Sequence, residues 1–390
     1  MTAVDVLICG AGPAGSALGA SLARAGATVL IVEAAEHPRP KACAEYASPR
    51  IAEELARIGL ASHWRDAAVR LSGMDLHAGG RSVPIRYADS HGPRAAWGVD
   101  RRAFDAMLAE HAVEAGAQLR QRTRLVGLIS DGTHVRGARI RDTTTGRDES
   151  VSAGWTVGAD GTRSIVSRLT GVDRPVRFPR RLGLVAHYSG MEGLTDHGEM
   201  HVGRGYYVGL APTPDGEVNV GMALPMMERT VAARDRFDAA IAGIPAVAGR
   251  LAASRRLTPI RGAAPIAHRV SSPAGQGWLL VGDAAGFVDP FTGEGIHRAL
   301  RSSRAAARAI LGGGDVAAAY VAERRRAFAA KTALSWLIQG FLAAPPLLDH
   351  AVARLSSRPR AALRLGSALG DCTPALDALS PRALLEVLGP

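Results

Sequence analysis

Residues 4–33, which read VDVLICGAGPAGSALGASLARAGATVLIVE, constrain the fold more than any other part of the chain. The apolar runs 4–9 and 27–32 predict two strands buried on both faces. Between them, a G-x-G-x-x-G sequence leads into a helix over Ser16–Ala25 that Gly26 closes. A glycine-rich turn between a buried strand and a helix is typical of the site where a helix N-terminus binds a pyrophosphate. The segment therefore predicts a dinucleotide site.

Each glycine of this turn has a separate expected task. Gly10 permits the tight turn, Gly12 lets a pyrophosphate approach the backbone, and Gly15 lets helix and strand pack closely. Glu33 follows the second strand, where a carboxylate accepts hydrogen bonds from an adenosine ribose. The strand, helix and acidic residue together make this a more specific signal than the glycine spacing alone.

Composition indicates an enzyme rather than a nucleic-acid-binding protein. The chain has 390 residues, 47% of them hydrophobic, which is enough for two domains. Its net charge is +11, but the basic residues are arginines apart from Lys41 and Lys331, and they are scattered along the sequence. Only 5% of residues are aromatic, so we expect a solvated basic surface and no nucleic-acid partner.

The cysteines and the apolar runs argue against a disulfide-rich, zinc-binding or membrane-spanning protein. The three cysteines form no C-x-x-C, so neither a disulfide framework nor a zinc site is expected. Cys43 stays open as a reactive thiol, although no basic neighbour pattern supports it. No 18-residue apolar stretch or secretory signal is present, which predicts a cytoplasmic protein. Residues 330–387 read as helical, and Trp336–Leu348, interrupted by Pro345-Pro346, leaves a peripheral membrane contact open.

Two later stretches repeat the arrangement of strand, turn and helix. Residues 157–164, VGADGTRS, predict a second phosphate-facing loop. In residues 277–300 a buried strand ends in Gly282-Asp283, and a glycine-rich loop leads to a helix that starts near Gly295. Asp283 can accept hydrogen bonds from sugar-type hydroxyls. The helix N-terminus at Gly293–Gly295 is placed to stabilise the negative region of a reduced flavin.

The middle of the chain predicts an antiparallel sheet. Residues 182–224 form three strand-like segments with a hairpin turn at Pro214–Gly216, and Met74–Tyr87 reads as another hairpin. His197 and His201 form an H-x-x-x-H. The strand pattern and the glycine between them argue against a helix that would hold both on one metal, so no metal site is expected.

The order of these motifs resembles the FAD-dependent oxidoreductases of the aromatic hydroxylase superfamily, the group A flavoprotein monooxygenases. The segments GDAAGFVDPFTGEGI, PRPKAC and VDRRAFD are most similar to its geranylgeranyl reductase branch. The resemblance implies an α/β fold with a Rossmann-like FAD-binding domain, an inserted antiparallel β-sheet substrate domain and a C-terminal helical region. The corresponding ranges are 1–72, 98–174 and 258–330 for FAD, 73–97 and 175–257 for substrate, and 331–390 for the helical region.

The resemblance also implies roles for single residues. Arg101 would lie near the ribityl-pyrophosphate, Asp283 would bind the ribityl chain, and Asp160 would sit near the pyrophosphate and assist a nicotinamide cofactor. The expected FAD-binding residues are Gly10, Gly12, Pro13, Ala14, Gly15, Glu33, Ala34, Lys41, Ala42, Arg101, Leu125, Asp160, Gly282, Asp283, Pro290, Gly293, Gly295 and Ile296. The substrate-orienting candidates are Tyr207, His201, Phe291 and Met222.

The departures from the family concern the reaction. Geranylgeranyl reductases carry Y-x-W-x-F-P, whereas residues 207–212 read YVGLAP, which keeps the Tyr and the Pro and replaces both large aromatics. The W-x-W-x-I-P of flavin halogenases and a second G-x-G-x-x-G do not occur. Because Tyr207, Gly209 and Ala211 alternate along one strand, they would share a face and leave a wide cavity.

We therefore expect an FAD-dependent monooxygenase that hydroxylates an apolar aromatic or polycyclic small molecule of secondary metabolism through a flavin C4a-hydroperoxide. NADH or NADPH would supply the electrons, directly or through a partner reductase. The alternatives are a geranylgeranyl reductase-like ene-reductase and a flavin-binding protein without turnover. A monomer or a homodimer is expected.

Overall fold

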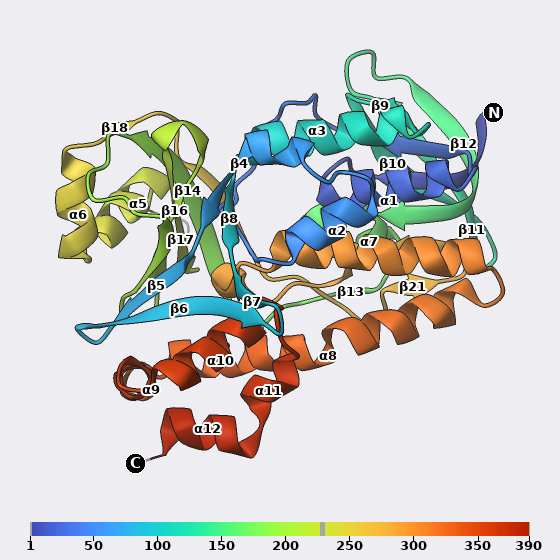
Figure 1. Ribbon diagram of the computed structural model, residues 1–390. Coiled ribbons are helices and arrows are strands. Elements are labelled where there is room, and N and C mark those ends of the chain that lie inside the picture. The colour runs from blue at the N-terminus through green and yellow to red at the C-terminus, as the bar shows by residue number, and fades with distance from the viewer. Residues whose placement is uncertain (1, 227–230, 390) are drawn as a thin grey trace.

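The computed structural model describes residues 2–226 and 231–389. Two large sheets stand side by side, helices cover the first of them, and a group of C-terminal helices lies below both in the view of Figure 1. This mixed α/β architecture confirms the expected fold class.

The first sheet has eight strands and a parallel centre. β1 pairs in parallel with β2 and β12, β2 pairs in parallel with β9, and β12 pairs in parallel with β22. β10, β11 and β12 run antiparallel. The strands are β1 (Thr2–Cys9), β2 (Val29–Val32), β9 (Gln118–Arg120), β10 (Thr123–Asp131), β11 (His134–Asp142), β12 (Asp148–Gly158), β21 (Ala274–Gly275) and β22 (Trp278–Leu280).

Three helices pack against this sheet because their facing residues are small or apolar. α1 is rich in Ala, Gly and Ser, and the missing side chain of Gly19 makes room for Ile31, whose Cδ1 lies 2.6 Å from where a Cβ would stand. α7 and α3 pack on α1. The helices are α1 (Pro13–Arg24), α3 (Arg101–Glu114) and α7 (Gly295–Gly312), with α2 (Ile51–Arg57) and α4 (Ile165–Leu169) nearby.

The second sheet has nine strands in the order β18-β14-β17-β16-β15-β5-β6-β7, with β19 on β14. Its pairs are antiparallel except for β5 with β15. β16 and β17 are joined by the turn at Pro214–Gly216, as the sequence predicts. The strands are β5 (Gly73–Ala78), β6 (Arg81–Asp89), β7 (Gly92–Arg94), β14 (Arg181–Ser189), β15 (His197–Val202), β16 (Tyr207–Pro212), β17 (Val218–Pro225), β18 (Arg255–Arg256) and β19 (Arg261–Ala263).

One face of the second sheet packs against α5 (Ala233–Ala242) and α6 (Pro245–Ala252), where Phe237 is fully buried. The sequence of residues 229–254 also predicts helix, and residues 229 and 230 lie outside those described. Short sheets complete the links between elements: β3 (Tyr46–Ala47) and β4 (Ala68–Leu71) pair with β8 (Ala96–Val99), and β13 (Asp173–Arg174) pairs with β20 (Arg269–Val270).

The chain ends in five helices. α9 and α10 pack on β6, and α8 runs beneath α7, with α11 and α12 lower still in the view of Figure 1. Within the described residues no single helix has the length and apolar character to span a membrane; α8 and α9 have them only jointly, with a bend of 112° at their junction. The helices are α8 (Val316–Ala343), α9 (Pro345–Ser356), α10 (Pro359–Leu369), α11 (Ala375–Leu379) and α12 (Pro381–Leu388).

Candidate active site

A cavity of about 680 Å³ lies where the carboxyl ends of the first sheet meet β14–β17 of the second. It collects nearly all of the residues that the sequence predicts for FAD, although these come from distant parts of the chain. Gly15 is the exception. The predicted residues that line the cavity are Gly10, Gly12, Pro13, Ala14, Glu33, Ala34, Lys41, Ala42, Arg101, Leu125, Asp160, Gly282, Asp283, Pro290, Gly293, Gly295 and Ile296.

The glycines of the first turn differ in their surroundings. A Cβ at Gly15 would lie 1.8 Å from the Gly10 carbonyl oxygen, so only glycine fits there. Gly10 has a φ of +105°, and a Cβ would lie 2.6 Å from the Ala159 oxygen. Gly12 faces the open cavity, and as N-cap of α1 it makes no side-chain capping bond. The first N–H groups of α1 keep donors for an anion, and this free helix end fits a pyrophosphate.

Glu33 is buried and already takes part in holding the turn. Its Oε2 accepts a hydrogen bond from Ala11 N at 2.9 Å, and its Oε1 accepts one from Ala35 N at 3.0 Å. Arg39, which sequence reasoning missed, lies 3.4 Å from Oε1 through its Nε. A carboxylate has about four acceptor positions, so Glu33 can still accept from ribose hydroxyls.

Arg101 is buried at the start of α3 and forms a two-pronged ion pair with Asp105, at 2.8 Å and 2.9 Å. Its Nη1 lies 3.3 Å from the Cys43 sulfur. Burial alone would lower the pKa of Arg101, but the Asp105 carboxylate raises it overall. Cys43 thus has a cationic neighbour that comes from 58 residues away. The expected place of Arg101 beside the ribityl-pyrophosphate stays a prediction.

Asp160 carries one unused acceptor. Its Oδ2 accepts from Ile165 N at 2.7 Å, whereas its buried Oδ1 has no hydrogen-bond partner among the described residues. Burial raises the pKa of Asp160, and the hydrogen bonds from Ser164 and Ile165 oppose that shift. A buried acceptor that faces the cavity is the kind of group that a bound ligand with hydroxyl or amide donors satisfies.

The N-terminus of α7 is held from behind by a buried ionic cluster. Glu294, its N-cap, receives a hydrogen bond from Ser335 Oγ at 3.3 Å. Lys331 Nζ lies 3.7 Å from Glu294 Oε2 and 3.0 Å from Asp371 Oδ1, and Asp371 also contacts His297 at 3.0 Å. Burial alone would raise the pKa of Asp371, but Lys331 and His297 lower it. The C-terminal helices therefore fix the end of α7 that faces the cavity.

Tyr207 and Phe291, two of the substrate-orienting candidates, meet at the part of the cavity wall that β16 and the loop before α7 form. Their rings pack edge to face with centroids 5.1 Å apart. The Tyr207 hydroxyl donates to Asp289 Oδ1 at 2.6 Å, and Arg181 holds Asp289 Oδ2 at 2.5 Å. Burial raises the pKa of Tyr207 well above its usual value, and the Asp289 charge adds to this. The phenol is therefore neutral.

The candidate Met222 also lines the cavity. In the register of β16 and β17, Gly221 lies opposite Gly209, whereas Met222 lies opposite Val208. Met222 in addition belongs to the apolar core with Phe237. Met200 of β15, opposite Gly209, lines the cavity as well, and the role of Met222 toward a substrate stays a prediction.

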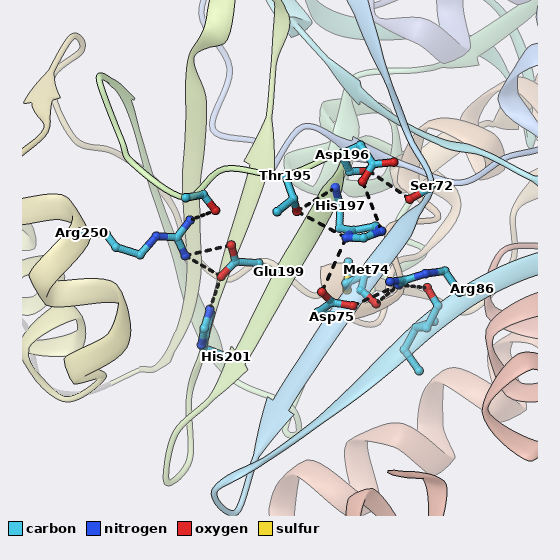
Figure 2. A network of polar contacts seen from close by, with 12 residues as sticks. Ser72, Met74, Asp75, Arg86, Thr195, Asp196, His197, Glu199, His201 and Arg250 are labelled. Atoms are coloured by element: carbon cyan, nitrogen blue, oxygen red, sulfur yellow. Dashed lines mark hydrogen bonds and ion pairs between the residues drawn. The ribbon is translucent and has the colours of Figure 1, made fainter. Parts of the chain in front are cut away.

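His201 differs from the other substrate-orienting candidates. It does not occur among the described residues that line the cavity, although Glu199, two positions earlier on the same face of β15, does. His201 Nε2 lies 2.8 Å from Glu199 Oε2, and Arg250 donates to both Glu199 oxygens. Figure 2 shows this group apart from the one that joins His197 to Asp75.

The two histidines of H-x-x-x-H therefore do not meet. His201 instead stacks on His77, with ring centroids 4.3 Å apart, and these two with Glu199 bring their ligand atoms within 4.8 Å of one another. Arg250 already occupies both oxygens of Glu199, which makes this group an ion-pair network (Figure 2).

Glu45 is a buried cavity residue that sequence reasoning left without a partner. Its Oε2 lies 2.7 Å from His187 Nε2 and 3.0 Å from Asn219 Nδ2, which also donates to the Cys43 carbonyl. The hydrogen bond that His187 donates to Glu45 raises the pKa of His187. Glu45 has a φ of 58°, an uncommon conformation for a residue with a side chain. The strands β14 and β17 thus hold the loop 41–45 at the cavity.

The comparison with known proteins follows from this geometry. A family model described as "FAD binding domain" matches residues 3–331. The chain belongs to this FAD-binding family. That membership agrees with the cradle that Gly12, Glu33 and the N-terminus of α1 form, and it confirms an FAD-dependent oxidoreductase.

Two curated relatives are reductases. The menaquinone reductase of Mycolicibacterium smegmatis is 33% identical over 334 residues, which cover 80% of this chain and 78% of the relative. The digeranylgeranylglycerophospholipid reductase of Methanosarcina acetivorans is 30% identical over 322 residues, with 80% and 77% covered. These relatives confirm the resemblance to the geranylgeranyl reductase branch.

Solved structures share the fold at lower identity. A flavin-dependent brominase has a TM-score of 0.83 at 23% identity, with 99% of each chain covered. A geranylgeranyl bacteriochlorophyll reductase-like protein from Thermoplasma acidophilum has a TM-score of 0.83 at 23% identity, with 99% of this chain and 97% of that chain covered. At this identity the likeness establishes the architecture alone.

Proposed function

We propose that this protein is an FAD-dependent ene-reductase that saturates a carbon–carbon double bond of an apolar isoprenoid lipid. The supporting observation is the wall of the cavity that β15, β16 and β17 provide. The side chains that face the cavity there are apolar or absent, at Met200, Gly209, Ala211 and Gly221, and Phe291 closes one end. Such a wall selects a substrate by shape and apolar contact.

The relatives support the same reaction class. Both curated proteins described above are named as reductases, and both names specify a lipid-soluble substrate. Saturation of an alkene consumes one hydride and one proton, and the overall reaction oxidises NADH or NADPH, directly or through a partner reductase.

FAD, when bound and reduced, supplies the hydride. The residues of this chain provide its binding and the rest of the environment. Gly12 and the N-terminus of α1 would hold the pyrophosphate, Glu33 the adenosine ribose and Asp283 the ribityl chain. The N-terminus of α7 at Gly295, where a Cβ would meet open space, would face the flavin ring and stabilise negative charge on it.

Glu45 and His187 are placed to hold the proton. Glu45 lines the cavity, and its hydrogen bond keeps a proton on His187 at a higher pH than usual. Tyr207 is fixed by Asp289, so its ring keeps one position against the substrate. The apolar wall excludes water from the reacting carbons.

The experiment is a single turnover under anaerobic conditions. The enzyme is reduced with dithionite and mixed with menaquinone or a geranylgeranyl glycerophospholipid. We expect the flavin to reoxidise and the lipid to gain two hydrogens by mass spectrometry, and in menaquinone this gain should remain after the quinol form has been oxidised back to the quinone in air. A lipid of unchanged mass with flavin that stays reduced contradicts the proposal.

A monooxygenase is the second candidate, and one observation favours it. Gly209 and Gly221 face each other where the reductase signature places an aromatic ring, so the wall leaves room for a rigid fused-ring substrate. Incorporation of one atom from ¹⁸O₂ into the product would support this candidate against the reductase.

A further inference from the structure

The outer side of α8 carries an apolar stripe. From Ala329 to Leu347 the exposed residues recur every three or four positions along α8 and the start of α9, and all of them are apolar or glycine. Trp336, at the middle of the stripe, is 44% exposed. No acidic residue occurs between Arg324 and Leu348. These residues mark a solvent-exposed side of α8 and of the start of α9.

The segment 174–180, RPVRFPR, extends the stripe sideways. The ring of Phe178 stacks on Trp336 with centroids 6.4 Å apart and planes 29° apart, and Phe178 itself is 49% exposed. Arg174, Arg177 and Arg180 of the same segment are also exposed. We call the segment 174–180 and the exposed residues of 329–347 the Phe178–Trp336 face.

The composition of this face matches the surface of an anionic membrane. Water disfavours two large rings that are each nearly half exposed. Aromatic rings partition into the headgroup region of a bilayer, and arginines beside them are attracted by anionic lipids. Asp173, directly before the segment, lies 3.5 Å from His268, and the next acidic residue after the segment is Glu192, so the three arginines outnumber the nearby carboxylates of this stretch. The net charge of +11 acts in the same direction.

A second copy of the chain fits this face less well. Two copies related by a twofold axis would place the same surface against itself. Arg177 and Arg180 would then approach their own counterparts, and like charges repel in a buried interface. A lipid bilayer instead offers negative headgroups for the arginines and an apolar interior for the rings.

The face also leads toward the cavity. A groove of about 410 Å³ beside Phe178 is lined by Pro175, Val176, Arg177, Arg180, Met226 and Pro265. Pro265 precedes Ile266, which lines the cavity, and Arg180 precedes Arg181, which holds Asp289. Residues 265–266 and 180–181 therefore connect the groove to the part of the cavity near Ile266.

We propose that the Phe178–Trp336 face docks on an anionic lipid bilayer, with the groove as the place where a lipid passes from the bilayer toward the cavity. The docking stands on the face itself. The passage of substrate rests on the proposed function.

Vesicle flotation of the FAD-loaded protein tests the docking. We expect binding to vesicles that contain phosphatidylglycerol, little binding to pure phosphatidylcholine, and loss of binding at high salt. The double variant Phe178→Ser with Trp336→Ser should reduce the partition coefficient at least about tenfold, and Arg177→Gln with Arg180→Gln should do so on anionic vesicles alone. Val113→Ser, on α3 at the opposite edge of Figure 1 and 47% exposed, is the matched control and should bind like the wild type.

The amount of bound FAD shows whether each variant is folded. Trp336→Phe is a milder second variant. Quenching of tryptophan fluorescence by brominated lipid should be weaker in Trp336→Phe than in the wild type. The proposal is overturned if the Ser double variant binds vesicles like the wild type. It is also overturned if the face instead mediates a dimer that this variant dissociates, or if the wild type binds nucleic acid rather than lipid through it. Turnover with substrate in detergent micelles separates the two proposals: the variant Phe178→Ser with Trp336→Ser, whose residues do not line the groove, should keep it, whereas failure of the reductase proposal leaves vesicle binding unchanged.

Discussion

The Tyr207 hydroxyl donates a 2.6 Å hydrogen bond to the buried carboxylate of Asp289, and this bond connects β16 of the second sheet to the loop before α7. Arg181 holds the other oxygen of Asp289 and also donates to Gln339 of α8 at 2.6 Å. A strand of the second sheet, the flavin-facing loop and a C-terminal helix therefore meet at one charged group.

This connection predicts the effect of two substitutions on stability. Tyr207→Phe removes a hydrogen bond to a charged group and should lower the free energy of unfolding by about 2 kcal/mol. Asp289→Asn leaves the buried Arg181 without its counter-charge and should cost about 3–5 kcal/mol. Urea unfolding of the FAD-loaded protein measures both. Tyr206→Phe is the control, because Tyr206 is partly exposed and its hydroxyl donates to an uncharged acceptor, the Ala240 carbonyl; its effect should be about 1 kcal/mol. Equal effects at 206 and 207 would contradict the role of Asp289.

The turn at the first helix predicts a loss of FAD. Gly15→Ala would place a Cβ 1.8 Å from the Gly10 oxygen and must displace the turn that faces the pyrophosphate. We expect the purified variant to lack FAD by its absorbance spectrum. Gly249→Ala in α6, where nothing lies within 4 Å of the added Cβ, should remain as yellow as the wild type. A Gly15→Ala protein with full FAD would show that this turn does not hold the cofactor.

The two acidic residues of the FAD site allow a comparison. Asp283→Ala should weaken FAD retention, since each charge-assisted bond to a ribityl hydroxyl contributes about 1.5–3 kcal/mol. From sequence, Glu33→Ala is expected to be milder because the adenosine end lies nearer to solvent. The structure leads us to predict the opposite order, since Glu33 is buried and its loss also leaves Ala11 N without its acceptor. The FAD that each variant retains is quantified after dialysis. Lower retention in Asp283→Ala than in Glu33→Ala would support the order expected from sequence.

The FAD half of the site could be predicted because its signals are local. Gly10, Gly12 and Glu33 lie within one stretch whose strand, turn and helix follow from neighbouring residues. Asp283 lies at the end of a buried strand, a position that the sequence shows by itself. An FAD-binding family can therefore be recognised from the sequence without knowledge of any long-range contact.

The substrate half depends on contacts that no local pattern contains. Alternation along β16 places Tyr207, Gly209 and Ala211 on one face, but only the pairing with β17 shows that Gly221, and not Met222, lies opposite Gly209. The bond from Tyr207 to Asp289 joins residues 82 positions apart. Asp289 precedes a proline and caps the short turn at Phe291, so the sequence marks it as a turn residue and leaves its ion pair unseen.

The pair of His187 and Glu45 predicts a pH dependence. The folded-state pKa of His187 is raised by Glu45, so the protonated form is favoured in the folded protein. This contribution to stability is fully present below the unfolded pKa of about 6.5 and is lost as the pH rises through the folded pKa. His187→Gln should therefore flatten the fall in unfolding free energy just above neutral pH. Urea unfolding at a series of pH values tests this, with the exposed His63→Gln as control; identical profiles for wild type and His187→Gln would remove His187 from this role.

The pair Gly209 and Gly221 predicts opposite outcomes for the same substitution. A Cβ at Gly209 would stand 3.6 Å from Met200 Cε, an ordinary contact, so a larger side chain there extends into the substrate half of the cavity. Gly209→Trp should keep FAD and lose turnover of a bulky lipid, with Gly209→Ala close to the wild type. A Cβ at Gly221 would lie 2.9 Å from Ala44 Cβ, in the loop that lines the flavin end. Gly221→Trp must displace that loop and should lower FAD retention as well as turnover. Absorbance and single-turnover measurements separate the two effects. Undiminished turnover in Gly209→Trp would place the substrate away from β16, and full FAD in Gly221→Trp would show that the loop 41–45 does not contact the flavin.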